Sequence, residues 1–444
     1  MAPKSETAPE SIFAPGVEAA AQAALAKARV RLLPFLFALY IANYLDRINV
    51  SFAALQMNHE LGLAPVAFGL GSGLFFVGYI ACEVPSNLIL ERVGARRWIA
   101  RIMISWGVIS SATMYVQGAR SFYVLRLLLG AAEAGFFPGI IFYLTYWFPR
   151  RERARASALF LTATALAGLV AGPLCGAILG MHGILGLSGW QWLFMLEGIP
   201  SVILGFVVLY YLPDGPAEAT WLSERERESL MALLHREYKE TAGAHRHSLS
   251  EGLASARVWT MGAIYFCIVV TIYGVAFWLP QIVKGLGTFT NLEIGFISAL
   301  PYLCAAVAMV VVGISSDRSG ERRWHLALSA FVGTAGLVLS ARAKGPVAAL
   351  LALSLAAAGL WATFGPFWSM PPEFLRGTAA AGGIALINSL GNAGGFFGPL
   401  LMGFLKELTH SFNGGLQILA VAVASAGVIV LLTYRGQVGL ASDE

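Results

Sequence analysis

Continuous stretches of about twenty apolar residues recur along the whole chain, and this pattern limits the possible folds more than any other feature. A helix rises about 1.5 Å per residue, so about twenty residues cross the hydrocarbon layer of a bilayer. Inside lipid, each backbone N–H and C=O must be paired, which leaves helices and closed barrels. The stretches do not alternate between apolar and polar residues, so we predict an all-α membrane protein.

Composition excludes an ordinary soluble protein. Only 12% of the 444 residues are charged, whereas soluble domains carry about 25%. Hydrophobic residues make up 57% of the chain, and its mean hydropathy is +0.69. The four cysteines, Cys82, Cys175, Cys267 and Cys304, fall inside apolar stretches without metal-ligand spacing. We therefore expect small buried side chains there, with no metal, disulfide or cofactor.

Twelve membrane spans are expected from the apolar stretches. They lie near residues 31–57, 66–90, 97–117, 121–147, 156–181, 191–212, 258–283, 292–315, 324–341, 346–370, 378–405 and 415–433. Lysine and arginine gather in the loops on the side of the N-terminus, and loops of this kind face the cytoplasm. Both termini are therefore expected in the cytoplasm. The pI of about 9.0 reflects this bias and not a nucleic-acid surface.

A long polar segment after the sixth span divides the chain into two halves. Ser223 and Glu226 have capping-box spacing, which predicts a surface helix with an apolar stripe of leucines. The leucines are Leu230, Leu233 and Leu234. The expected division is a disordered tail over 1–28, six-helix bundles over 29–213 and 257–436, a cytoplasmic linker over 214–256 and a tail over 437–444.

The two halves share an internal repeat with a constant offset. An acidic-Arg-x-Gly-x-Arg-Arg loop follows the second span and recurs after the eighth, and Gly172-Pro173 recurs as Gly398-Pro399 at the same spacing. An even number of spans separates the copies, so the halves are related by an axis along the membrane normal. The loop residues are Glu91, Arg92, Gly94, Arg96 and Arg97 in the first half, and Asp317, Arg318, Gly320, Arg322 and Arg323 in the second.

These loops have a candidate mechanical role. The carboxylate at a helix end can pair with an arginine across a gate between the bundles, and the glycine permits a tight turn. The alternative is that the basic residues only anchor the loop on the cytoplasmic side.

Four charged residues fall inside the expected spans, where a charge costs about 2.5–3.5 kcal/mol on insertion scales. Asp46 and Arg47 lie in the first span, and Arg126 and Glu133 lie in the fourth. Neighbours on a helix point about 100° apart, so Asp46 and Arg47 are expected to face different surroundings. Arg126 and Glu133 share a face about 10 Å apart, too far for direct pairing unless they lean together or a substrate bridges them.

The chemistry of these residue types suggests a coupling mechanism. Arginine binds a carboxylate through two parallel hydrogen bonds and stays charged at any working pH. Aspartate and glutamate in a low dielectric can take up and release protons. We therefore expect protonation of Glu133 to release Arg126 for an anionic substrate, while Asp46 gates Arg47 or the cytoplasmic exit. The alternative is that these charges form buried salt bridges that only fix helix packing.

The spans of the second half carry no charge of their own and offer polar and aromatic side chains instead. Asn388 and Asn392 share one helix face and are candidates to bind the hydroxyls or second carboxylate of a substrate. The alternative is hydrogen bonding between helices. The full candidate set is Tyr273, Gln281, Trp368, Ser369, Asn388 and Asn392, with Trp278 and Trp361, and Tyr79 in the first half. Glu83 and Glu197 are expected to be packing residues bonded to neighbouring backbone.

The repeat and its loops resemble the major facilitator superfamily over the whole chain apart from the N-terminal tail. The resemblance implies two six-helix bundles that rock around a central cavity near the bilayer midplane. Residues 44–49 and 126–139 are similar to the anion:cation symporter branch of that superfamily. The branch implies substrate binding by Arg47, proton coupling by Asp46 and Glu133, and Arg126 as the partner of Glu133. Tyr44, in the same motif, joins the substrate-binding candidates.

Residues 365–389 are similar to the tartrate and aromatic-acid carriers of this branch, and less similar to its galactonate carriers. We therefore expect a proton-coupled symporter that imports a small organic carboxylate, with a tartrate-like hydroxy-dicarboxylate favoured. Aromatic acids of the phthalate or hydroxyphenylacetate type, and sugar acids, are alternatives. The expected setting is a monomer in the inner membrane, with the organic anion, protons and lipid as partners and no nucleic acid.

Two further alternatives concern mechanism and class. A uniporter or exchanger of the same fold would not concentrate substrate under a pH gradient, and its Asp46→Asn and Glu133→Gln variants would retain exchange. A membrane enzyme or sensor is disfavoured, because the loops show no nucleotide-binding motif, metal spacing or nucleophile–base pair.

Overall fold

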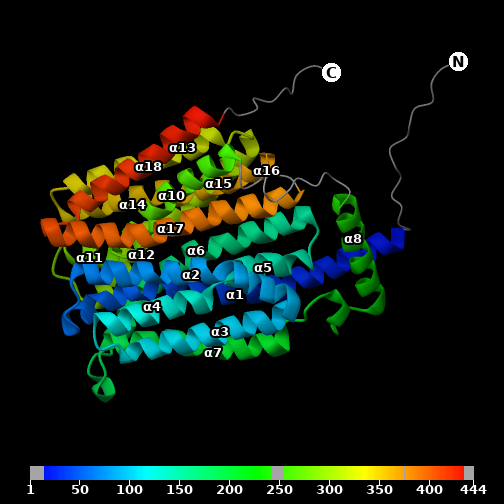
Figure 1. Ribbon diagram of the computed structural model, residues 1–444, viewed down its shortest axis with the longest axis horizontal. Helices are drawn as coiled ribbons and strands as arrows, with labels where there is room; N and C mark the ends of the chain where they lie inside the picture. The colour runs from blue at the N-terminus through cyan, green and yellow to red at the C-terminus, as the bar shows by residue number, and fades with distance from the viewer. Residues whose placement is uncertain (1–14, 243–254, 375–376, 435–444) are drawn as a thin grey trace.

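The computed structural model describes residues 15–242, 255–374 and 377–434, and these segments are helical without a strand among them. Figure 1 shows two groups of long helices side by side, with the linker helix α8 (Glu224–Ala242) at one end. The first group is α1 (Pro15–Glu60), α2 (Pro65–Val93), α3 (Ala95–Ala112), α4 (Ala119–Glu133), α5 (Phe136–Thr145), α6 (Arg150–Leu179) and α7 (Gly189–Tyr211). The second is α10 (Ala256–Ala276), α11 (Leu279–Lys284), α12 (Asn291–Ser319), α13 (Arg323–Arg342), α14 (Pro346–Ala362), α15 (Phe364–Ser369), α16 (Pro371–Phe374), α17 (Gly377–Thr409) and α18 (Asn413–Thr433).

Ten helical segments within the described part of the chain are long and apolar enough to cross a membrane. Helices α1 and α3 are not among them. Helix α3 carries Arg96, Arg97 and Arg101 in its 18 residues, and α1 carries Asp46 and Arg47 in its C-terminal half. Both nevertheless pack among the apolar helices, α1 against α6 and α7, and α3 against α7 (Figure 1). Asp46 and Arg47 of α1 are buried within the bundle, and the charged groups of α3 lie toward its end.

Three of the expected continuous spans are broken, which corrects the sequence-based boundaries. The fourth span divides into α4 and α5 at Ala134 and Gly135, the seventh into α10 and α11, and the tenth into α14 and α15. Proline explains the first break, because Pro138 has no N–H for the carbonyl of Ala134. The Ser86 hydroxyl donates to that carbonyl at 2.6 Å instead, and Gly135 takes a φ of +86°.

The N-terminal segment differs from the expected disordered tail. Helix α1 begins at Pro15, so residues 15–28 are helical, whereas residues 1–14 and 437–444 lie outside the described part. Lys27 donates to a carboxylate oxygen of Glu226 at 2.9 Å, which ties this extension to α8 and lowers the pKa of the Glu226 carboxyl. The capping box is confirmed, because the Glu226 N–H donates to the Ser223 hydroxyl at 3.3 Å and the Ser223 N–H donates back at 2.8 Å.

The two halves touch along α2 with α17 and along α6 with α12. We call the end that carries α8 the linker end and the opposite end the far end. A methyl group added to Gly69 of α2 would overlap the carbonyl of Pro399 in α17, and one added to Gly295 of α12 would overlap the carbonyl of Gly172 in α6. Gly69 and Gly295 occupy equivalent positions of the repeat, so the internal symmetry of the sequence is realised as two matching backbone contacts.

The close approach at Gly295 predicts how the far end responds to a larger side chain. Gly295→Leu is expected to separate α6 from α12, because the obstacle is backbone and cannot move aside. Spin labels at Leu185 and Val347, both exposed at the far end, measure this as a longer distance in double electron–electron resonance. Gly313→Leu on the same helix is the matched control, since no atom lies within 4 Å of its added carbon. An unchanged distance distribution in Gly295→Leu would contradict the inferred contact.

Candidate functional site

A cavity lies between the two halves and is lined from both of them. Eight of the expected substrate-binding candidates line it: Tyr44, Arg47, Tyr79, Tyr273, Trp368, Asn388 and Asn392, with Trp361 of α14. The first three come from α1 and α2, and the others come from α10, α14, α15 and α17. The structure therefore brings the charged half and the polar half of the chain together around one space.

Arg47 is the cation of this cavity, and it is held from both halves. Its Nε donates to Glu133 Oε1 at 3.1 Å, and its Nη2 forms an ion pair with the same oxygen. Its Nη1 donates to the Tyr273 hydroxyl of the other half at 3.2 Å. The guanidinium also lies over the rings of Phe75 and Tyr79, at 5.2 and 5.4 Å from their centroids. A carboxylate entering the cavity therefore competes with Glu133 for Arg47.

This arrangement corrects the expected pairing of Arg126 with Glu133. Helix α4 ends at Glu133, and its carboxylate turns to Arg47 of α1. Arg126 lies two turns earlier, is 1% exposed, and none of its three guanidinium nitrogens has a hydrogen-bond partner among the described residues. Its neighbours are the rings of Phe75 and Phe277, with centroids at 5.0 and 6.0 Å. A buried arginine without an acceptor is able to receive an anion.

Asp46 faces a different environment from Arg47, as the helical geometry predicts. Its Oδ1 accepts hydrogen bonds from the Ser110 hydroxyl of α3 and from Asn49 Nδ2, the latter at 3.0 Å. The side chain is 1% exposed, does not line the cavity and does not pair with Arg47. The expected direct gating of Arg47 by Asp46 is therefore absent from the arrangement described here. Asp46 belongs to a buried polar cluster behind the cavity wall.

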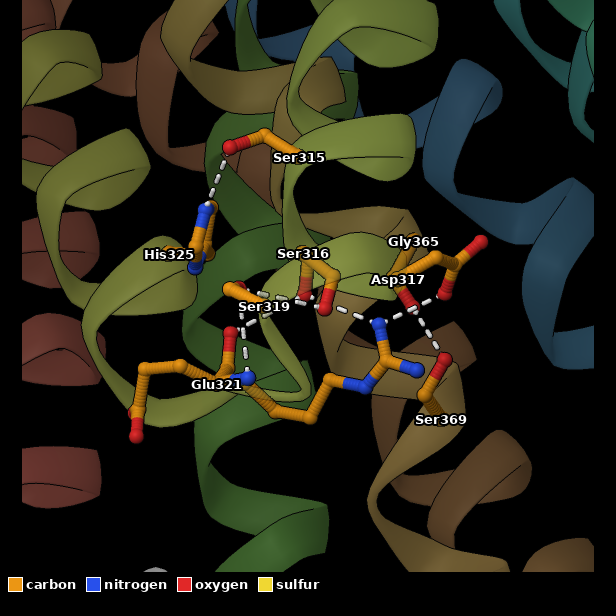
Figure 2. Close-up of polar contacts among 9 residues, drawn as sticks. Ser315, Ser316, Asp317, Ser319, Glu321, His325, Gly365 and Ser369 are labelled. Atoms are coloured by element: carbon orange, nitrogen blue, oxygen red, sulfur yellow. Dashed lines mark hydrogen bonds and ion pairs between the residues drawn. The ribbon is translucent and has the colours of Figure 1, made fainter. Parts of the chain in front are cut away.

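Other expected site residues lie elsewhere or bond differently. The Ser369 hydroxyl donates to the Gly365 carbonyl of its own helix at 2.9 Å (Figure 2), and Gln281 lies in α11 away from the cavity lining. Among the described residues, the carboxyls of Glu83 and Glu197 bond to side chains and not to backbone as expected. Asn388 donates to Glu83 at 2.9 Å, and the Cys175 thiol donates to Glu197 at 3.3 Å.

The two repeated loops both lie at the linker end, but their ion pairs form within one loop or with the linker and not with the other loop. Asp317 accepts from Arg322 at 2.6 Å within the second loop, and Arg322 also donates to the Ser316 hydroxyl at 3.0 Å (Figure 2). Arg96 of the first loop approaches Asp214 of the linker at 3.6 Å. Among the described residues, neither Glu91 nor Asp317 forms an ion pair with an arginine of the other bundle, so the expected pairing across a gate stays a prediction. The prediction for the turns is confirmed.

Glycine explains why these turns are tight. Gly94 and Gly320 have φ values of +96° and +69°, which side chains other than glycine rarely adopt. The chain reverses there between α2 and α3, and between α12 and α13. Glu91, Arg92, Arg97 and Arg318 lie beside these turns, and Glu91 lines a pocket next to the linker.

Several cavity residues were missed from the sequence. Tyr40 and Tyr265 line the cavity, together with Phe137 and Thr164. Tyr40 had a readable signal, because Tyr40, Tyr44 and Arg47 are spaced four and three residues apart and so share one helix face. Phe137 and Thr164 had no such signal, because the break after Glu133 changes the direction of the chain that follows it.

Comparison with known families decides what kind of protein carries this site. The family model described as "Major Facilitator Superfamily" matches residues 36–399. The chain belongs to the major facilitator superfamily. It is therefore a transporter and not an enzyme, in agreement with the two groups of helices and the repeated loops.

Individual relatives within the superfamily cover most of the chain. A protein of Agrobacterium vitis named "Putative tartrate transporter" is 47% identical over 411 residues, which span 93% of this chain and 91% of that protein. "Putative metabolite transport protein NicT" of Pseudomonas putida is 44% identical over 88% of this chain and 90% of its own. A "Quinolone resistance transporter" of Acinetobacter baumannii is 40% identical over 91% of this chain and 93% of its own.

Solved structures agree with the fold. A bacterial homologue of the human lysosomal transporter Spinster has a TM-score of 0.71 at 15% identity, and covers 91% of this chain and 95% of its own. The xylose transporter XylE of E. coli has a TM-score of 0.71 at 14% identity, and covers 92% of this chain and 98% of its own. At such identities the likeness concerns the major facilitator fold alone.

Proposed function

We propose that this transporter is a proton-coupled symporter that imports a small organic carboxylate, with a tartrate-like hydroxy-dicarboxylate as the favoured substrate. The observation that carries the proposal is Arg47, a cavity-lining cation whose present partner is the buried carboxylate of Glu133. A relative 47% identical is named as a tartrate transporter, which supports the choice of acid.

The coupling step revises the sequence-based version, because Arg47 takes the place of Arg126. A carboxylate substrate and Glu133 compete for the same guanidinium, so a proton on Glu133 favours the substrate. When the proton leaves Glu133, the ion pair with Arg47 re-forms and the substrate is displaced. Proton binding and anion binding are then linked, because ionised Glu133 and the anionic substrate exclude each other from Arg47.

Arg126 suits the second carboxylate of a dicarboxylate. The guanidinium groups of Arg126 and Arg47 lie 5.0 and 5.2 Å from the centroid of the same ring, Phe75. Arg126 does not line the cavity itself, but two arginines next to one aromatic ring offer two anion sites close together. A monocarboxylate would leave one of these two sites unoccupied.

We place this transporter in the inner membrane as a monomer with twelve spans, counting α1 and α3 with the ten apolar segments. The linker end, which carries the arginines of the repeated loops, faces the cytoplasm by the positive-inside rule. Both termini then lie in the cytoplasm. The far end faces outward, and its backbone contacts at Gly69 and Gly295 separate the cavity from the outside in this arrangement.

A second substrate class is favoured by one observation. The cavity wall is rich in aromatic rings, among them Tyr265, Trp361 and Trp368. Rings of this kind stack on aromatic substrates, so an aromatic acid is the alternative to a hydroxy-dicarboxylate. An uncoupled uniporter or exchanger is the alternative mechanism.

Counterflow in proteoliposomes tests the substrate class. Vesicles loaded with unlabelled L-tartrate are expected to take up labelled L-tartrate, and external aliphatic hydroxy-dicarboxylates are expected to compete better than phthalate or galactonate. Stronger competition by phthalate would instead favour the aromatic acid. Absence of competition by every carboxylate would reject an organic acid as the substrate.

A further inference from the structure

One buried carboxyl group lies at the contact between the two halves and is not used in the coupling step above. Glu83 of α2 is 6% exposed, and its Oε1 accepts a hydrogen bond from Asn388 Nδ2 of α17 at 2.9 Å. Helices α2 and α17 are one of the two helix pairs along which the halves touch. Glu83 therefore connects the first half to the second half, whose own spans carry no charge.

Asn388 has two roles at once, because it lines the cavity and bonds Glu83. Its neighbour Asn392 lines the same cavity one helical turn away. Tyr79, one turn before Glu83 on α2, lines the cavity as well. Glu83 thus lies directly behind a wall to which a bound substrate has access.

The charged and titratable groups around Glu83 come from several helices. Arg47 of α1 attracts its carboxylate, and Tyr79 on its own helix and Tyr265 of α10 interact with it electrostatically. Glu133 of α4 acts on Tyr79 but is paired with Arg47. Arg101 of α3 interacts electrostatically with Cys82, the residue before Glu83. Among the described residues no ion pair to Glu83 is formed, so its one direct side-chain partner is the Asn388 amide.

The two ends of an asparagine amide have opposite hydrogen-bonding character. The nitrogen donates and the oxygen accepts, whereas an ionised carboxylate only accepts and a protonated one also donates. An ionised Glu83 therefore accepts a hydrogen bond from the Asn388 nitrogen, and the amide oxygen points away from Glu83. A protonated Glu83 can donate to the amide oxygen, which turns the amide over and frees its N–H donors.

We propose that Glu83 sets which end of the Asn388 amide faces the cavity, so that both N–H donors of Asn388 are available to an anionic substrate only while Glu83 carries a proton. This inference rests on the proposed function. It makes Glu83 a positioning residue that acts through Asn388. It also gives the uncharged half a way to sense the proton, in addition to the contest between Glu133 and substrate for Arg47.

Binding of L-tartrate to the purified full-length transporter tests the inference at acidic and alkaline pH. Glu83→Gln keeps the size of the side chain and can donate to the Asn388 oxygen at every pH. At alkaline pH this variant is expected to bind tartrate about tenfold more tightly than the wild type, the worth of one hydrogen bond to a charged group. At acidic pH the two proteins are expected to bind equally.

A double-mutant cycle separates this role from simple packing. In an Asn388→Ala background, Glu83→Gln is expected to change tartrate affinity by less than about twofold, because the amide it acts through is gone. In an Asn392→Ala background the gain of about tenfold is expected to persist, since Asn392 is the matched asparagine one turn away. Additive effects of Glu83→Gln and Asn388→Ala would overturn the inference.

Infrared difference spectra give a second readout that packing does not move. Tartrate binding at a pH between the two extremes is expected to increase a protonated-carboxyl band in the wild type, and that part of the band is expected to disappear in Glu83→Gln. An unchanged band in Glu83→Gln would overturn the inference even if the variant were unstable. If the wild type binds no carboxylate, the proposed function fails as well, whereas tartrate binding with an additive cycle refutes only the role of Glu83.

Discussion

Replacing Arg47 with lysine is expected to lower L-tartrate uptake about a hundredfold, through weaker binding of the substrate. Arginine uses Nε and Nη2 on Glu133 and Nη1 on Tyr273, a three-point geometry that a single ammonium cannot reproduce. Each hydrogen bond to a charged group contributes about 1.5–3 kcal/mol, so the loss of one or two accounts for the expected factor. Labelled uptake into proteoliposomes and direct binding in detergent measure the two steps separately.

Arg120→Lys is the matched control for this prediction. Arg120 is exposed in the first turn of α4 at the far end, away from the cavity. We expect its replacement to leave uptake within about twofold of the wild type, as for surface substitutions in general. Wild-type affinity for tartrate in Arg47→Lys would show that Arg47 is not the principal anion site.

Glu133→Gln is expected to abolish the accumulation of substrate driven by a proton gradient. The glutamine has the shape of a protonated glutamate and cannot re-form the ion pair with Arg47, so the competition that links proton to anion is lost. Wild-type affinity for tartrate is expected to rise as pH falls, because protonation of Glu133 frees Arg47. In Glu133→Gln the affinity at alkaline pH is expected to exceed that of the wild type at the same pH, because the competition for Arg47 is gone.

Glu152→Gln provides the comparison for Glu133→Gln. Glu152 pairs with Arg29 at 2.5 Å at the linker end, outside the cavity, and such partly exposed pairs contribute little. Accumulation is expected to persist in this variant. A Glu133→Gln transporter that still concentrates tartrate under a proton gradient would remove Glu133 from the coupling mechanism.

Much of the fold follows from the sequence because each inference rests on a local physical requirement. Apolar length predicts spans, and the recurrence of Gly172-Pro173 as Gly398-Pro399 predicts two related halves. The repeat also relates two residues that contact each other across the halves. Arg47 and Tyr273 occupy equivalent positions in it, and they meet across the cavity at 3.2 Å.

The pairing of the buried charges could not be obtained in the same way. Spacing along α4 fixes the separation of Arg126 and Glu133, but not which neighbouring helix each side chain faces. The choice between Arg47 and Arg126 as the partner of Glu133 depends on the rotation of α1 and on the break after Glu133. Pro138, four residues after Ala134, was the sequence signal for that break.

The expected gate pairs depend on conformation for a related reason. Asp317 and Arg322 are close in sequence, so their pairing within one loop at 2.6 Å is possible whatever the relation between the halves. A pair across the gate requires the linker ends of both bundles to meet. The sequence specifies the residues of such a pair but not the conformation in which it forms.

Gradient-driven uptake in proteoliposomes tests the central claim most directly. The membrane potential is set to zero with potassium and valinomycin, an inward proton gradient is imposed, and internal labelled L-tartrate is compared with the external concentration. The proposed symport predicts accumulation above the external concentration that collapses with a protonophore and is absent in Glu133→Gln. Equilibration without accumulation, for tartrate and for every other carboxylate tried, would contradict proton-coupled carboxylate symport.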